Sequence, residues 1–272
     1  MGEKLQMKKI VILGATGMLG SAVNEHFKKT NNTIISSYRT SGLLDQESSF
    51  YFDVITSKFN EIPDCDYLLN CIGIIKPFMK ENLADSIYIN SVFPHKLSQY
   101  CKEKSIKLIH ITTDCVFSGK DGQYHEDSIH DCEDEYGKSK SLGEPKDCMV
   151  IRTSIIGEEV HKNASLIEWI KKNKGKTING FTEHFWNGVT TKHYAEICEQ
   201  IIDQDLYETG LFHIHSNMVD KNQLLQIINK KFDLNINVIP TKTSVVDRTL
   251  KSNKKLVDKI HVKSIQQQID EL

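Results

Sequence analysis

The sequence predicts an α/β protein with a doubly wound parallel sheet and a smaller C-terminal lobe. Short apolar runs alternate with longer amphipathic stretches through the first half of the chain, which is the pattern of strand-helix-strand units. Runs such as "IVIL" and "YLLN" are continuously apolar, as required of strands covered on both faces. A glycine-rich turn joins the first apolar run to the first amphipathic stretch.

The individual elements follow from these patterns. Strands are predicted, in chain order, at residues 9–14, 32–38, 49–54, 66–73, 107–114, 149–154 and 211–216. Helices are predicted at residues 18–30, 87–105, 134–145 (ending at "GEP"), 163–175 (closed by Gly175), 190–205 and 220–233. The alternation weakens after residue 157, and the residues after 233 resemble a mixed polar tail. We therefore expect a Rossmann domain of residues 1–157 plus about 190–217, and a substrate lobe of residues 158–189 plus 218–272.

The composition excludes several classes of protein. The chain has 272 residues, 39% of them hydrophobic, and a net charge of -2, so it suits a globular protein without a general affinity for nucleic acid or membranes. Its seven cysteines form no C-x-x-C pair, which favours a reducing cytoplasm and predicts no metal site. Residues 221–263 hold ten Lys/Arg against three Asp, which suits either an anionic ligand or a solvated surface.

The glycine-rich turn "GATGMLG" predicts a dinucleotide site. Gly14, Gly17 and Gly20 follow a strand and open a helix, where backbone N–H groups and the helix N-terminus can face a pyrophosphate. Thr16, Met18 and Leu19 complete the predicted contact.

The second strand end predicts the type of nicotinamide cofactor. NAD-binding proteins commonly carry an acidic residue there, whereas this chain has "SSYRTSG". Ser37 and Arg39 are expected to bind the 2′-phosphate of NADPH. NAD is the alternative cofactor, and Arg39 is alternatively an ordinary surface arginine. Asp53, after the third strand, is placed to meet the adenine edge.

A catalytic set follows the fifth strand. Tyr136 and Lys140 are four residues apart on a predicted helix and therefore share a face. One positive charge at roughly 4 Å, at an effective dielectric near 20, contributes on the order of 4 kcal/mol, which lowers a phenol pKa by up to about three units. Thr113, at a strand end, can hydrogen-bond a carbonyl that Tyr136 protonates.

These motifs together resemble the extended short-chain dehydrogenase/reductases, and within them the dTDP-4-dehydrorhamnose reductase group. The stretches "GATGMLG", "TTDCVFSGKDGQYHEDS", "EYGKSKSLGE" and "IRTSIIGE" carry the resemblance. It implies a Thr113, Tyr136, Lys140 triad that reduces a 4-keto-6-deoxy sugar on a nucleoside diphosphate, with NADPH as hydride donor. It also implies a homodimer and no nucleic-acid or membrane partner.

The resemblance implies roles for further positions. Cys71, Gly73 and Ile74 would border the nicotinamide ribose, and Thr153 with Ser154 the nicotinamide carboxamide. The implied substrate contacts are Lys76, Asn90, Thr113, Asp114, Ser154, Trp186, Asn187 and Arg248. Asn90 also matches a position that often braces the active site. For Trp186, ordinary packing in the lobe is an equal alternative.

Cys115 departs from the group, which typically has tyrosine there. GDP-fucose synthase and similar bifunctional enzymes place a catalytic cysteine at this offset, so Cys115 with His184 is an alternative epimerase pair. A small buried cysteine is the plainer interpretation. Three functions thus stay open: a 4-ketoreductase for surface glycans, a 3,5-epimerase/4-reductase of a UDP-, GDP- or dTDP-linked (or 2-acetamido) sugar, and a non-catalytic NADP-binding regulatory subunit.

Overall fold

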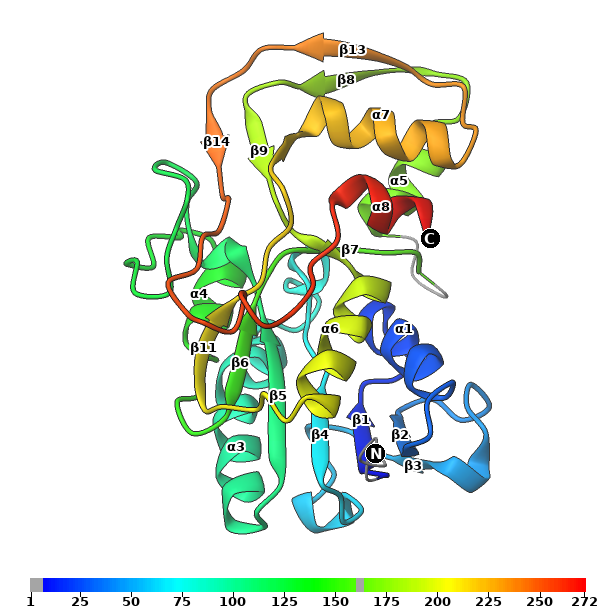
Figure 1. The fold of residues 1–272 in the computed structure, drawn as a ribbon, viewed down its shortest axis with the longest axis vertical. Coiled ribbons are helices and arrows are strands. Elements are labelled where there is room, and N and C mark those ends of the chain that lie inside the picture. Colours follow the sequence, from blue (N-terminus) through cyan, green and yellow to red (C-terminus); the bar gives the residue numbers. More distant parts are fainter. Residues whose placement is uncertain (1–6, 160–163) are drawn as a thin grey trace, which may run out of the picture.

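The computed structural model describes residues 7–159 and 164–272 (Figure 1). Its centre is a seven-stranded sheet in the order β11-β6-β5-β4-β1-β2-β3, in which all neighbouring strands are parallel. The strands are β1 (Lys9–Leu13), β2 (Thr33–Tyr38), β3 (Ser49–Tyr51), β4 (Tyr67–Asn70), β5 (Lys107–Thr112), β6 (Met149–Arg152) and β11 (Gly210–His213). All seven predicted strands are present, and the doubly wound fold is confirmed.

The two faces of this sheet are covered by different helices. On β1, Ile10 and Ile12 join the core formed with α1 (Met18–Phe27) and α6 (Thr191–Asp203), whereas Val11 and Leu13 join the core formed with α3 (Phe93–Glu103). Alternate side chains of a strand point to opposite faces, so an apolar run without alternation fills both cores.

The helix predicted at residues 87–105 is instead built from three pieces. Asn82 caps α2 (Leu83–Ile87), a π-helical turn follows at Tyr88–Val92, and α3 then begins at Phe93. The helix predicted at residues 134–145 is shorter, because α4 ends at Ser141. Gly143 lies against the backbone of the π-helical turn, where a Cβ atom would come within 1.8 Å of the Asn90 carbonyl oxygen.

The lobe lies beyond the carboxyl ends of the strands, at the top of Figure 1. It contains α5 (Leu166–Lys171), α7 (Lys221–Lys231) and α8 (Ile265–Asp270), which share one apolar core. Its strands are β8 (Thr177–Phe181) paired with β13 (Asn237–Thr241), and β9 (His184–Trp186) between β12 (Val219–Asp220) and β14 (Val246–Asp247). β7 (Ile155–Ile156) pairs with β10 (Val189–Thr190).

The prediction of a polar tail after residue 233 is wrong. Apart from α8, this segment supplies β13 and β14, which pair with β8 and β9 from far earlier in the chain. Ser264 and Gln267 form a capping box at the start of α8, a sequence signal that the polar composition conceals.

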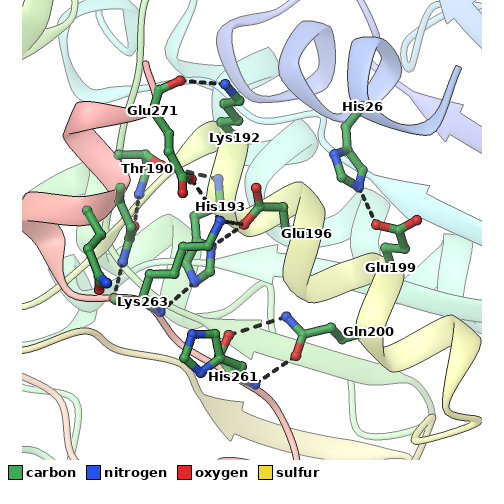
Figure 2. Close-up of polar contacts among 12 residues, drawn as sticks. His26, Thr190, Lys192, His193, Glu196, Glu199, Gln200, His261, Lys263 and Glu271 are labelled. Atoms are coloured by element: carbon green, nitrogen blue, oxygen red, sulfur yellow. Dashed lines mark hydrogen bonds and ion pairs between the residues drawn. The ribbon is translucent and has the colours of Figure 1, made fainter. Parts of the chain in front are cut away.

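A polar network fastens the C-terminal segment to α6 (Figure 2). The backbone N–H of Lys263 donates to Nε2 of buried His193, which leaves Nδ1 to donate to Glu196 at 2.6 Å. The Lys263 ammonium binds both Glu196 and Glu271 at 2.8 Å. The lobe is thereby held against the helix that covers the large sheet.

The two units are interleaved in the sequence. Leu256 and Ile260 pack in the core of the large sheet, although the predicted boundaries place them in the lobe. Residues 1–6 and 160–163 lie outside the described residues. The predicted domains include both stretches, and the helix predicted at residues 163–175 begins at the last of them. Among the described helices, none has the length and apolar character needed to cross a membrane.

Candidate active site

A cavity of about 330 Å³ opens where the strand ends of the large sheet meet the lobe. The glycine loop, the segment after β4, the β5 exit and α4 line it on one side, and the chain leading into α5 lines it on the other. Predicted site residues on its wall are Gly17, Met18, Leu19, Cys71, Gly73, Ile74, Thr113, Asp114, Cys115, Tyr136, Lys140, Thr153 and Ser154.

The glycine loop is shaped to receive an anion. Gly14 has a φ of +78°, and a Cβ atom on Gly20 would come within 2.0 Å of the Gly14 carbonyl oxygen, so both positions require glycine. Gly17 is the N-cap of α1, and neither a capping side chain nor an acidic residue occupies the first turn. The first N–H groups of α1 therefore face the cavity without a side-chain acceptor, as suits a pyrophosphate.

The predicted role of Ser37 is wrong. Ser37 is only 1% exposed, and its hydroxyl accepts a hydrogen bond from the backbone N–H of Gly14 at 2.8 Å. The Ser37 side chain therefore stabilises the glycine loop from its buried side and is not available to a 2′-phosphate. Arg39 is exposed just past the end of β2, and the Asp53 carboxylate accepts from the N–H of Ile55. Thr16 lies partly exposed in the loop.

The three predicted catalytic residues converge on one wall of the cavity. Thr113 follows β5, while Tyr136 and Lys140 lie on α4, whose N-cap Asp134 accepts from the N–H of Gly137. Gly137 packs on the β5 exit, where a Cβ atom would come within 2.4 Å of the Cys115 carbonyl oxygen. The absence of a side chain at Gly137 thus brings the helix with Tyr136 close to Thr113.

Burial sets the protonation of this triad. Burial raises the pKa of Tyr136 well above its usual value of 10, and the hydroxyl of Thr113 opposes this through a hydrogen bond. Burial also lowers the pKa of Lys140 to about 8, with the charge of Glu144 acting in the opposite direction. Before any ligand binds, the tyrosine is therefore a protonated phenol, and the lysine is the group that titrates near neutral pH.

Asn90 braces the active site, as the resemblance implies, and its buried amide is not offered to a substrate. It is fully buried on the π-helical turn, and its amide bonds both the N–H and the carbonyl of Ile74 at 2.9 Å. It also donates to the hydroxyl of Ser139 on α4 at 3.1 Å. Asn90 thus ties the loop after β4 to the helix of the triad, a use typical of π-helical turns near functional sites.

Cys115 and His184 do not meet in the described structure. The Cys115 thiol lies 3.6 Å from the Asp114 carboxylate, and burial raises its pKa to about 12. The His184 ring instead contacts the Thr243 hydroxyl at 3.1 Å and the Phe181 ring. The structure therefore gives no support to the predicted epimerase pair.

The predicted substrate contacts from the lobe differ in their accessibility. Trp186 is 4% exposed within the lobe core, so its ring offers almost no face for stacking a base. The Asn187 amide donates to the Leu250 carbonyl and accepts from the Leu250 N–H, and Lys76 forms an exposed ion pair with Asp134. Arg248 donates from Nε to the Phe117 carbonyl at 2.9 Å and is partly exposed.

Sequence reasoning missed several residues near the site, of which Thr112 and Lys221 are two. Thr112, directly before Thr113, lines the cavity. Lys221 begins α7, and burial lowers the pKa of its ammonium while the charge of Asp114 opposes this shift. The excess of basic residues after 221 is the one sequence signal that pointed toward Lys221, and it did not single this residue out.

The family model described as the RmlD substrate binding domain matches residues 7–257. The chain belongs to this family. The resemblance predicted from the sequence is thereby confirmed. With an assembled Thr–Tyr–Lys triad, this RmlD family member is an oxidoreductase.

Individual relatives are distant. The chain is 25% identical over 222 residues to the probable low-salt glycan biosynthesis reductase of Haloferax volcanii, which covers 75% of this chain and 73% of that protein. It is 25% identical over 252 residues to methionine adenosyltransferase 2 subunit beta of Mus musculus, covering 84% and 73%. The dTDP-4-dehydrorhamnose reductase of Bacillus anthracis, solved in complex with NADP, superposes with a TM-score of 0.74 at 16% identity, covering 98% of each chain.

Proposed function

We propose that this protein uses NADPH to reduce the 4-keto group of a nucleoside-diphosphate 4-keto-6-deoxy sugar in glycan biosynthesis. The observation that carries the proposal is the convergence of Thr113, Tyr136 and Lys140 beside the open glycine loop in a single cavity. Family membership and the glycan reductase among its relatives support the substrate class.

Each triad residue has a distinct task in this reaction. The Thr113 hydroxyl orients the sugar carbonyl, and the protonated phenol of Tyr136 donates its proton to the carbonyl oxygen as the alcohol forms. The Lys140 ammonium stabilises the tyrosinate that remains. When bound, the reduced nicotinamide supplies the hydride. The residues fit this cofactor, because the uncapped first turn of α1 can hold its pyrophosphate and Gly73 leaves room beside Lys140.

NADP preference and dimer formation belong to the same proposal. Arg39 supports NADP, since an exposed guanidinium at the end of β2 can bind a 2′-phosphate. Exposed apolar side chains at Val92 and Leu142 support a homodimer, since they lie on two segments joined by the hydrogen bond between His95 and the Leu142 carbonyl. Light scattering during size-exclusion chromatography measures the mass directly.

The proposed activity is tested by NADPH consumption with dTDP-4-keto-6-deoxyglucose and with the corresponding UDP-2-acetamido-4-keto sugar, run in deuterated water. We expect turnover with at least one substrate and a product without deuterium at C3 and C5. Deuterium at either carbon, lost in Cys115→Ala, would assign an epimerase-reductase instead. Tight NADPH binding with no turnover of either sugar would contradict the reductase proposal and favour a regulatory subunit.

A further inference from the structure

Arg152 is the centre of a buried polar network beside the helix of the triad. Its side chain is completely buried, and it lies on β6, directly before Thr153 of the cavity wall. The guanidinium donates to both carboxylate oxygens of Glu144, three residues after the end of α4. It also donates from Nη1 to Nε2 of His213 at 2.8 Å and from Nη2 to Nε2 of His130 at 2.6 Å.

The guanidinium determines the protonation of both imidazoles. Arg152 can only donate hydrogen bonds, so Nε2 of each ring is an unprotonated acceptor and the ring proton lies on Nδ1. In His213 this Nδ1–H donates to two backbone carbonyls, at 3.0 and 2.9 Å. In His130 it donates to the hydroxyl of Ser141, the last residue of α4, at 2.6 Å. Both histidines are therefore neutral, and His130 connects the guanidinium directly to the helix of the triad.

The two histidines differ in how readily they take up a proton. His213 is completely buried, and burial lowers its pKa to about 4, with the charge of Arg152 acting in the same direction. The His130 side chain is 23% exposed, and burial lowers its pKa less. The charges that face His130 are Glu144 and Asp131, which oppose this shift, and Arg152, which adds to it. His130 is thus the first of the two to be protonated as the pH falls.

A proton on Nε2 of His130 is incompatible with the observed contacts. It would set two donors and two positive charges against each other, because Nη2 of Arg152 lies only 2.6 Å away. The nearest carboxylate oxygen belongs to Glu144, 3.7 Å from Nε2, and it already accepts from the same Nη2. Protonation therefore breaks the contact between His130 and Arg152 and competes for Glu144, so it weakens both attachments of α4 to β6.

We propose that His130 is a positioning residue whose neutral form holds α4 to Arg152 and whose protonated form releases the end of this helix, so that reduction is lost in acid. The inference rests on the proposed function and deepens it, because it adds control by pH to the same site. His130 is not among the residues that line the cavity, and it exchanges no proton with the sugar. Since α4 has only seven residues, a movement of Ser141 reaches the adjacent Lys140.

The test compares the pH dependence of kcat in the wild type, His130→Gln and the control His26→Gln, between about pH 5 and 8. Glutamine keeps an acceptor for Arg152 and a donor for Ser141 but does not titrate. His26 is a matched control, because its side chain is 21% exposed and its partner, Glu199, lies on α6. We expect kcat of the wild type and of His26→Gln to fall about tenfold per pH unit below the pKa of His130. His130→Gln should not show this fall.

Hydrogen exchange measures the release of the helix without any substrate and without a variant. Relative to intrinsic exchange rates, the backbone amides of α4 should lose protection in the wild type as the pH falls below about 6.5, the usual pKa of histidine. The folded protein binds the His130 proton less tightly than the unfolded chain does, because the pKa is lowered. The free energy of unfolding should therefore decline over the same range, and less steeply in His130→Gln.

The outcomes separate this inference from the reductase proposal. An acid fall in kcat that persists in His130→Gln, or protection of α4 that does not change with pH in the wild type, would overturn the inference and leave the reductase proposal intact. Absence of turnover at every pH, with protection of α4 lost in acid as expected, would overturn the reductase proposal and not the role of His130 in holding α4.

Discussion

The ammonium group of Lys140 lies 3.3 Å from the carbonyl oxygen of Ile111, two residues before Thr113. The strand that precedes Thr113 thus also positions Lys140, the residue proposed to act on Tyr136. Since Gly137 packs closely on the same strand exit, the relative positions of the three catalytic groups are fixed by one strand and one short helix.

Removing the phenolic hydroxyl tests the proton donor. Tyr136→Phe is expected to lower kcat by about a hundredfold to ten-thousandfold, the usual contribution of a positioned acid. NADPH affinity, measured by fluorescence, should change little because the ring and Lys140 remain. A variant that turns over at the wild-type rate would remove Tyr136 from the mechanism.

The pH dependence of turnover should report Lys140. Its ammonium is present below a pKa of about 8, so the charge that stabilises the tyrosinate is lost as the pH rises through that value. We expect kcat/KM for reduction to fall on the alkaline side of about 8. The same alkaline fall in kcat/KM should persist in Cys115→Ser, because the pKa of the Cys115 thiol is raised to about 12 and the thiol does not titrate in this range. A flat profile to pH 10 would contradict this assignment.

Two glycines of the loop should respond differently to alanine. Gly20→Ala places a Cβ atom 2.0 Å from the Gly14 carbonyl oxygen, and we expect it to lower the free energy of unfolding by about 3 kcal/mol through overpacking. Gly17→Ala is the matched control, because its Cβ atom meets nothing closer than 3.4 Å. Urea denaturation measures the free energy of unfolding of both variants. Equal values for Gly20→Ala and Gly17→Ala would show that the loop relaxes around the added methyl group.

The buried pair of Arg152 and Glu144 should be a determinant of stability. The Arg152 side chain is completely buried and binds both carboxylate oxygens of Glu144, at 3.0 and 2.6 Å. Glu144→Gln leaves that cation without its counter-charge and should cost about 3 to 5 kcal/mol in unfolding free energy. Exposed Glu133, 3.8 Å from Lys120, is the control, and Glu133→Gln should cost less than about 1 kcal/mol.

Arg39 should govern the choice between the two nicotinamide cofactors. Arg39→Ala is expected to weaken NADPH binding by about tenfold to a hundredfold through loss of a charge-assisted contact, and to leave NADH binding unchanged. The ratio of the two dissociation constants is the measurement. An equal effect on both cofactors would place Arg39 outside the 2′-phosphate site.

Sequence reasoning reached the large sheet and the triad because their signals are local. Glycine spacing, continuous apolar runs and the four-residue interval between Tyr136 and Lys140 each report on a few neighbouring residues. It failed at Ser37, whose hydroxyl is buried and accepts from the N–H of Gly14. It did not predict the π-helical turn that carries Asn90, whose amide bonds Ile74 and Ser139.

The sequence by itself thus determined the fold class, the glycine loop and the three residues proposed to be catalytic. Only the tertiary structure decided the strand pairing of the lobe, where β13 and β14 pair with strands about 60 residues earlier in the chain. It separated Cys115 from His184, whose ring contacts the Thr243 hydroxyl instead. Such contacts depend on how segments distant in the sequence pack together. This packing is set by the shape and burial of whole helices and strands, which the spacing of residues within one element does not report.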